Sequence, residues 1–203
     1  FINFIYYIGG KVELLSNGAG LTAVVFLPLI SALVLTAIPK SQELLIKGFA
    51  LVSSIVTFII SALLLPEFDF SNADKLQLGN KITWIKSINA NYEIGIDGIS
   101  LPLLILSTFI TVLAIIYSIE HLPEPKSPKG FLALILVLET GMNGTFVALD
   151  LILFFVFFEI VLLPMYFMIG IWGDKTVRSV AGFKNEIETR LYASIKFFVF
   201  TLF

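Results

Sequence analysis

Long apolar runs dominate the chain. Five of them hold roughly 20 residues each, the length that an α-helix needs to cross a hydrocarbon core about 30 Å thick. The runs are continuous instead of alternating at every second residue, which favours helices over barrel strands. A sixth run, residues 191–203, is too short to cross. The pattern predicts an all-α fold, a polytopic transmembrane helix bundle with five full spans and the start of a sixth, the five being residues 21–38, 44–65, 99–118, 131–149 and 151–172.

The remaining segments complete the expected organisation. Residues 1–20 form an N-terminal extension or an interfacial segment, and residues 21–203 form one transmembrane domain. The loop 66–98 is mixed polar, which is compatible with short strands or with a surface helix. Because the chain starts at Phe1 and its last apolar run is short, we expect a fragment of a longer polytopic protein.

Composition narrows the function classes. Charged residues make up 14% of the chain and hydrophobic residues 58%, whereas soluble domains carry about 25% charged residues. This excludes a soluble globular protein. The absence of Cys excludes a Cys-ligated zinc site or iron–sulfur cluster, and a single His argues against a His-rich metal site. A net charge of −2 excludes a basic nucleic-acid binder. We therefore expect an integral, multi-pass protein of the lipid bilayer with no metal-binding or cofactor-binding residues of its own.

The loops differ in positive charge, and this difference predicts the orientation. With alternating spans, one side carries Lys11 and three Lys of the loop 66–98, and the other side carries eight Lys and Arg. Cytoplasmic loops are normally richer in Lys and Arg. The loop 66–98 and the turn at Asp150 are therefore expected on the outer side.

Two carboxylates lie deep inside predicted spans. Glu159 is eight residues past Leu151, and Glu139 is eight residues past Phe131. At a rise of about 1.5 Å per residue, each lies roughly 12 Å from its own starting end, near the middle of the membrane. A charged group there costs about 2.5–3.5 kcal/mol on insertion scales and usually marks an ion or proton pathway. The sequence does not show whether the two side chains face each other.

The chemistry of these carboxylates has two interpretations. A buried acid whose protonation responds to a nearby cation can carry protons, and a hydrogen-bonded acid can simply hold helices together. The first is favoured for Glu159, which phenylalanines surround in sequence, while Glu139 stays open between the two. Pro164 leaves the carbonyl of Ile160 without its helical donor, which allows a bend or a water, or produces an ordinary packing kink.

Other polar residues near the membrane have more ordinary interpretations. Lys196, near the start of the sixth run, either reaches the cytoplasmic surface or serves as the cationic partner of a relay. Asp150 is expected to cap the fifth span, and His121 is expected in a solvated loop. The cluster of Gly141, Asn143 and Gly144 allows close helix approach.

Several segments resemble a known family. Residues 91–101 (NYEIGIDGISL) resemble the segment before the third helix in antiporter-like subunits of proton-pumping NADH:quinone oxidoreductase, respiratory complex I. Residues 139–151 (ETGMNGTFVALDL) and 157–173 (FFEIVLLPMYFMIGIWG) resemble its chain-M type, the equivalent of mitochondrial subunit four. Residues 191–201 (LYASIKFFVFT) are similar to the start of its sixth helix. The resemblance covers the chain from about Leu21 onward.

The resemblance implies a fold and a function. The family fold has fourteen helices with two inverted repeats. Glu159 matches the fifth-helix Glu, which pairs with a seventh-helix Lys in proton translocation driven by quinone reduction elsewhere in the complex. Glu139 matches an acid of the fourth helix. The partners would be other membrane subunits of complex I, with NADH, flavin, iron–sulfur clusters and quinone held by partner subunits.

We therefore expect a proton-translocating subunit of NADH:quinone oxidoreductase in a bacterial plasma membrane, without redox chemistry in this chain. One alternative is a subunit of a multi-subunit cation/proton antiporter or a membrane-bound hydrogenase. A further alternative is a non-transporting membrane scaffold whose buried acids only hold helices together.

Overall fold

A computed structural model describes residues 18–123, 125, 127–178 and 187–202. Most of the extension 1–20, together with Lys11, Lys126 and Lys184 of the charge count, lies outside the described residues. Five of the helices are long and apolar enough to cross a membrane. They are α3 (Ala19–Ala37), α4 (Glu43–Ala62), α5 (Ser100–Glu120), α6 (Pro128–Val147) and α7 (Leu151–Trp172), and they are followed by the shorter α8 (Thr189–Leu202).

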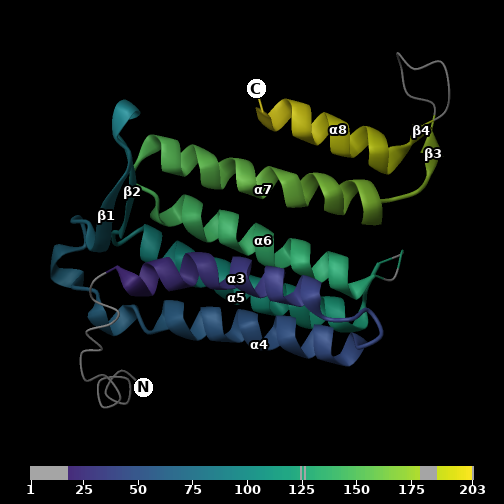
Figure 1. Cartoon of the computed structure of the whole chain (residues 1–203), viewed down its shortest axis with the longest axis horizontal. Coiled ribbons are helices and arrows are strands. Elements are labelled where there is room, and N and C mark those ends of the chain that lie inside the picture. Colours follow the sequence, from purple (N-terminus) through teal and green to yellow (C-terminus); the bar gives the residue numbers. More distant parts are fainter. Residues whose placement is uncertain (1–17, 124, 126, 179–186, 203) are drawn as a thin grey trace.

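The helices are arranged as a four-helix bundle with two added helices. The bundle consists of α3, α4, α5 and α6, where each helix packs against two neighbours and α4 also touches α6 across the middle. Helix α7 packs on the outside of α6, and α8 packs on α7 (Figure 1). This arrangement confirms the predicted bundle of five spans and the start of a sixth.

The helix ends carry charges of the expected sign. At the start of α5, the Asp97 carboxylate accepts hydrogen bonds from the backbone N–H groups of Ile99 and Ser100, and the Ser100 hydroxyl accepts one from Asp97 N–H. At the other end of the bundle, the Lys129 ammonium donates to the carbonyl of Ile38, the C-cap residue of α3. Acids at helix N-termini and cations at C-termini both satisfy free backbone groups and oppose the helix dipole.

The loop between α4 and α5 forms an antiparallel hairpin. It consists of β1 (Gln77–Ile85) and β2 (Ala90–Ile96), with short 3-10 turns at Leu65–Glu67, Phe70–Asn72 and Lys86–Ile88. Of the two possibilities expected for this loop, the structure therefore has the strands. Residue Ile94 of β2 bridges to Ala148, and Leu149 N–H donates to Glu93 O at 2.9 Å. The hairpin thus closes the end of the bundle where α6 passes into α7 (Figure 1).

Two apolar clusters fill the bundle, one near each end. We call the end of the bundle at the hairpin the outer end, after the orientation expected for it, and the opposite end the inner end. The outer cluster lies beneath the hairpin and includes Leu21, Val24, Leu64, Ile94, Ile96, Leu101, Leu104, Val147 and Phe157. The inner cluster lies at the opposite end and consists of Ala32, Leu35, Ile46, Ala50, Ile115, Leu132, Ile135 and Leu136. The space between these clusters is not apolar, and it holds one of the two candidate carboxylates.

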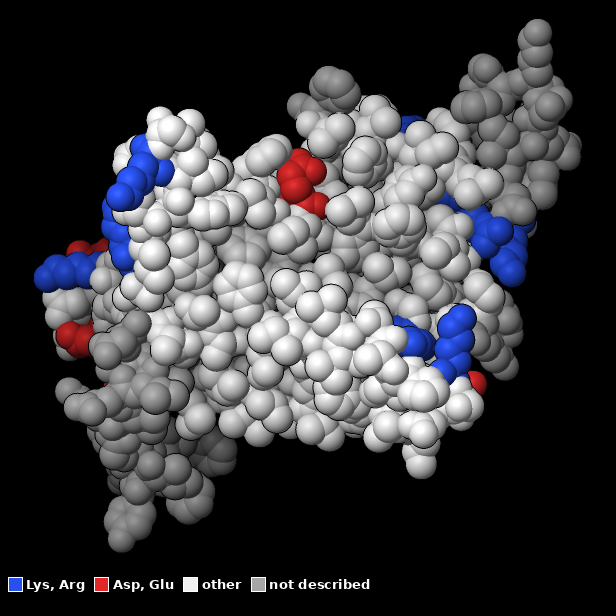
Figure 2. All heavy atoms as spheres, viewed as in Figure 1, with Lys and Arg blue, Asp and Glu red and all other residues white. Residues whose placement is uncertain are grey.

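The outside of the molecule is apolar between two charged ends. Figure 2 shows a mostly white middle, Lys and Arg toward both ends, and one small acidic spot part-way along. Of the five long helices, α7 is the least covered by the rest of the protein. In its most apolar stretch of 18 residues 22% is buried, against 50% in the corresponding stretch of α6. Its free surface is suited to lipid or to further apolar helices. The chain is an integral, multi-pass membrane protein.

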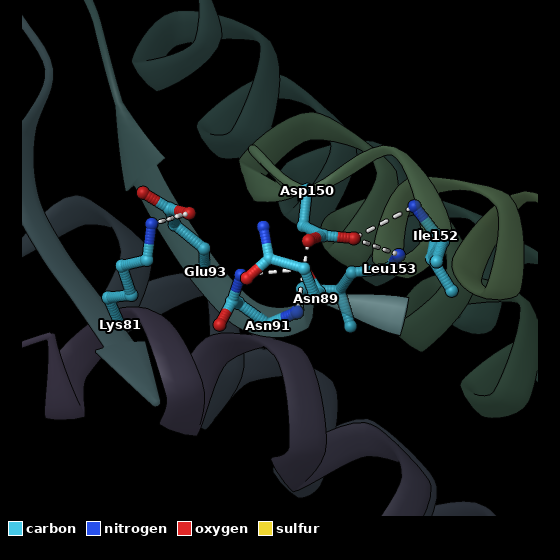
Figure 3. A network of polar contacts seen from close by, with 7 residues as sticks. All are labelled: Lys81, Asn89, Asn91, Glu93, Asp150, Ile152 and Leu153. Atoms are coloured by element: carbon cyan, nitrogen blue, oxygen red, sulfur yellow. Dashed lines mark hydrogen bonds and ion pairs between the residues drawn. The ribbon is translucent and has the colours of Figure 1, made fainter. Parts of the chain in front are cut away.

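Asp150 anchors the hairpin to α7. Its carboxylate accepts from Ile152 N–H at 2.9 Å and Leu153 N–H at 3.2 Å, which confirms the predicted cap, and also from Asn91 N–H of β2 at 3.0 Å (Figure 3). The hydrogen bond from Asn91, followed by those from Leu153 and Ile152, holds the pKa of Asp150 below its ordinary value. The charged form is therefore the one that the fold stabilises.

This predicts a pH-dependent contribution from Asp150. A lowered pKa in the folded state means stabilisation above the unfolded pKa of about 3.9, lost as the pH falls through the folded value. Asp150→Ala should lower the Tm at pH 7, and the difference from the unsubstituted protein should shrink below about pH 4. Thermal unfolding in detergent across this pH range measures it. The control is Asp74→Ala, an exposed acid without a side-chain hydrogen bond among the described residues; equal Tm losses in both variants at pH 7 would contradict the assignment.

Candidate functional site: two carboxylates on opposite sides of a helix pair

Glu139 points into the four-helix bundle. Its side chain is 0% exposed, and neither carboxylate oxygen has a hydrogen-bond partner within the described part of the chain. It lies eight residues before the outer end of α6 at Val147. At about 1.5 Å per residue this places it roughly 12 Å below that end, in agreement with the expected depth.

Buried polar side chains line the interior of the bundle at this depth and on either side of it. We call them the polar layer, and it consists of ten residues of α4, α5 and α6: Ser53, Ser54, Thr57, Ser61, Ser107, Thr108, Thr111, Glu139, Thr140 and Asn143. Ser118, near the inner end of α5, is also buried and is not counted with them. Asn143 links three helices, since its amide donates to Val24 O of α3 and its carbonyl accepts from Ser107 of α5. Ser61 of α4 and Thr108 of α5 are 2.8 Å apart. Hydrogen bonds between helices in lipid typically contribute about 0.6–2 kcal/mol each.

Sequence reasoning did not identify this layer. The sequence pattern predicts only close helix approach at Asn143, and it places the hydroxyl residues within apolar spans without assigning them a role. A signal was present in the second span, where Ser53, Thr57 and Ser61 recur every four residues. This spacing places hydroxyls on one helix face.

Glu159 lies on the other side of the α6–α7 contact. It lines a groove of about 450 Å³ beside α7 and α8, together with Phe155, Val156, Ile160, Leu163 and Phe198. Its side chain is half-buried, and it forms no hydrogen bond or ion pair with any residue that the structure describes. It is eight residues past Leu151, so it shares the depth of Glu139 to within a few Å.

The small residues of α6 decide which way the two acids point. A Cβ atom at Gly144 would overlap the Phe157 ring, and one at Gly141 would come within 2.7 Å of Val161. These glycines therefore let α7 lie directly against α6. At 100° per residue, Glu139 is turned about 150° away from the two glycines, and Glu159 about 160° away from Phe157 and Val161. The structure therefore does not bring the two carboxylates together.

Lys196 is likewise separate from Glu159. Its ammonium lies 5.6 Å from the Tyr192 ring centre and 5.8 Å from that of Phe200, both on its own helix. Ser194, which is buried and next to Gly170 of α7, marks the face of α8 that packs inward. Because Lys196 is turned about 200° from Ser194, it points away from α7. Its role as a cationic partner stays a prediction.

Pro164 lies inside α7, and His121 lies at the exposed end of α5. Helix α7 continues through Pro164, which is buried, and the carbonyl of Ile160 lies beside Glu159 without the N–H that a non-proline residue would offer. His121 is exposed and stacks on Tyr117, with ring centres 4.6 Å apart. Among the described residues, no group of three or more His, Asp or Glu side chains is arranged to hold a metal ion.

Comparison with known proteins supplies the family. The model described as NADH-ubiquinone oxidoreductase chain 4, amino terminus, matches residues 23–145. The model described as NADH:quinone oxidoreductase/Mrp antiporter, TM, matches residues 148–203. The chain belongs to the chain 4 family of NADH-ubiquinone oxidoreductase. The family match confirms the resemblance of the chain to the chain-M type.

Individual chain 4 relatives cover most of this chain. It is 37% identical over 185 residues to NADH-quinone oxidoreductase subunit M of Rickettsia typhi, which covers 88% of this chain and 34% of that protein. It is 36% identical to NAD(P)H-quinone oxidoreductase chain 4 of Gloeobacter violaceus, over 89% of this chain and 31% of that protein. It is 34% identical to NADH-ubiquinone oxidoreductase chain 4 of Marchantia polymorpha, over 91% of this chain and 34% of that protein. The chain thus spans about a third of the length of these relatives.

One solved structure shares the fold. The membrane-bound sulfane sulfur reductase, an archaeal respiratory membrane complex, contains a chain that superimposes with a TM-score of 0.63 at 18% identity. The superposition covers 89% of this chain and 25% of that one. Such a likeness supports the helix arrangement alone.

The glycine contact makes a prediction about α6 and α7. Gly144→Ala should destabilise their packing by about 1–3 kcal/mol, because the added methyl group cannot fit beside Phe157. The measurement is the Tm of the purified protein in its complex. The control is Gly48→Ala, where a Cβ meets nothing within 4 Å. Equal stability of the two variants would contradict the close contact.

Proposed function

We propose that this chain belongs to a proton-translocating membrane subunit of an NADH:quinone oxidoreductase, with Glu159 as a proton carrier and Glu139 as a second proton site. The family supports the enzyme complex, since the relatives are named as subunits of such oxidoreductases. The observation that carries the proposal is Glu159 itself: a carboxylate at mid-membrane depth, in a groove of about 450 Å³, with no partner among the described side chains.

The setting of Glu159 suits a group that changes its protonation. An intramembrane carboxylate is costly when charged and far less costly when it holds a proton, and a nearby cation reverses this preference. The groove leaves one side of Glu159 open to a group from outside this chain. The Ile160 carbonyl beside it offers a hydrogen-bond acceptor to a protonated carboxyl or to water.

Redox chemistry and proton binding would take place in different subunits of the complex. We infer that partner subunits hold NADH, flavin, iron–sulfur clusters and quinone, and that this chain's residues bind and release protons without redox chemistry. Other membrane subunits and lipid would cover the free surfaces of α7 and α8. Rickettsia and Gloeobacter are bacteria, in agreement with the expected bacterial plasma membrane.

A conservative substitution tests the carrier. In the complete protein within its complex, Glu159→Gln should lower proton pumping by about tenfold or more, because it removes the group that binds the proton. Assembly should persist, since Glu159 contacts no polar partner here. Proton uptake by inverted vesicles, normalised to the amount of assembled complex, measures the effect.

The control for this test is Glu120→Gln, which makes the same chemical change at an exposed position at the end of α5. It should pump normally. Normal pumping in Glu159→Gln would instead favour a non-transporting scaffold.

A second candidate is a subunit of a multi-subunit cation/proton antiporter. The family that matches residues 148–203 is described by both names, NADH:quinone oxidoreductase and Mrp antiporter, and this supports the antiporter as a second candidate. Sodium efflux that is driven by a proton gradient and lost in Glu159→Gln would support the antiporter; quinone-dependent proton pumping supports the oxidoreductase.

A further inference from the structure

Helix α3 contains a proline inside the four-helix bundle. Pro28 is buried, and the helix continues on both sides of it from Ala19 to Ala37. Proline has no backbone N–H, so the carbonyl four residues earlier, Val24 O, lacks the donor that an α-helix would otherwise give it. Val24 is 0% exposed. An unpaired carbonyl at such a place is costly, because the hydrocarbon core supplies no donor.

The side chain of Asn143 meets this carbonyl. Its amide nitrogen donates to Val24 O at 3.2 Å, and its amide oxygen accepts from the Ser107 hydroxyl at 3.1 Å. The partners decide which way the amide points. A backbone carbonyl can only accept, so the nitrogen has to face Val24, and the oxygen is left for Ser107. A side chain of α6 thus provides a donor where Pro28 has removed one from α3.

Asn143 is one helical turn from Glu139. Residues four apart on a helix lie on the same face, with their Cβ atoms about 5–6 Å apart. Both side chains are 0% exposed. The hydrogen bonds from Asn143 to α3 and α5 therefore fix the rotation and the depth of α6 within one turn of its buried acid. Helix α6 cannot turn or slide without leaving Val24 O unpaired.

We propose that Asn143 is a positioning residue. Its amide replaces the backbone donor that Pro28 removes from α3, and this bond holds α6 so that Glu139 stays inside the bundle. The importance of placing Glu139 rests on the proposed function, in which this acid is the second proton site. The pairing of Asn143 with the carbonyl freed by Pro28 does not rest on it.

A double-mutant cycle tests the replacement of the donor. Asn143→Leu removes the amide at nearly constant size and should lower the Tm of the complete protein in its complex, because Val24 O loses its partner. Pro28→Ala introduces a backbone N–H that can reach Val24 O. In that background, Asn143→Leu should therefore cost less than half of the same Tm loss.

Pro102→Ala is the matched control for the proline. Pro102 is exposed and lies in the first turn of α5, where a backbone N–H has no acceptor within the helix. In the Pro102→Ala background, Asn143→Leu should cost its full Tm loss. Equal losses in the native and Pro28→Ala backgrounds would overturn the replacement of the donor.

The same cycle works if Asn143→Leu prevents assembly, with the amount of assembled complex in place of the Tm. Recovery of assembly with Pro28→Ala and not with Pro102→Ala supports the assignment. Recovery with both, or with neither, overturns it.

Infrared spectroscopy of the complete complex tests the positioning of Glu139, whose carboxyl band is the one lost in Glu139→Gln. Asn143→Leu, made in the Pro28→Ala background if assembly requires it, should shift this band, because α6 loses its tie to α3 and the carboxyl loses a polar group one turn away. Thr145→Val is the control. The Thr145 hydroxyl bonds back to Gly141 O on its own helix, so the band should stay in place.

An unchanged Glu139 band in Asn143→Leu would overturn the positioning role, since a loss of stability alone does not move the band of one carboxyl. Proton pumping by Glu159→Gln is measured separately. Normal pumping there would contradict the proposed function and would leave the Tm cycle and the infrared result intact, so the two failures are distinguishable.

Discussion

The hydrocarbon core offers no hydrogen bonds, and this constraint organises the chain. Each polar group inside the membrane has to find a partner within the protein or pay a large free-energy penalty. In the four-helix bundle, Asn143 meets the constraint by joining α3, α5 and α6. Glu139 and Glu159 are the intramembrane acids for which the described residues offer no partner. These two acids therefore mark two places inside the membrane where a bound proton or a water molecule could satisfy the carboxylate.

Close packing keeps those two places apart. Gly141 and Gly144 let α7 lie on α6 so tightly that the side chains of Phe157 and Val161 fill the contact. One acid then faces the interior of the bundle and the other faces the α7–α8 groove, although both lie at one depth. At the outer end, Asp150 fixes this geometry by holding the start of α7 and the β2 strand together. The helix pair, its glycines and its cap act as one positioning unit.

The sequence predicted what depends on hydrophobicity and length. The five spans, the depth of the two acids and the cap at Asp150 all follow from local rules. It did not predict which way Glu139 and Glu159 point, because this depends on which helix the glycines accept as a neighbour. It also missed the polar layer, since isolated hydroxyls are common in membrane helices and gain meaning only when three helices bring them together. The hairpin was one of two alternatives, because the alternation in residues 77–96 is irregular.

As a proton carrier, Glu159 needs a polar or hydrated neighbour inside the membrane that lets its carboxylate gain and lose a proton. An experimental density map of the complete protein in its complex, at a resolution that shows water, reveals that neighbour. We expect the Glu159 carboxyl in the groove beside α7, within about 3.2 Å of a basic group, a polar side chain or an ordered water. A carboxyl that points to lipid tails, with neither polar neighbour nor water, would rule out a carrier role.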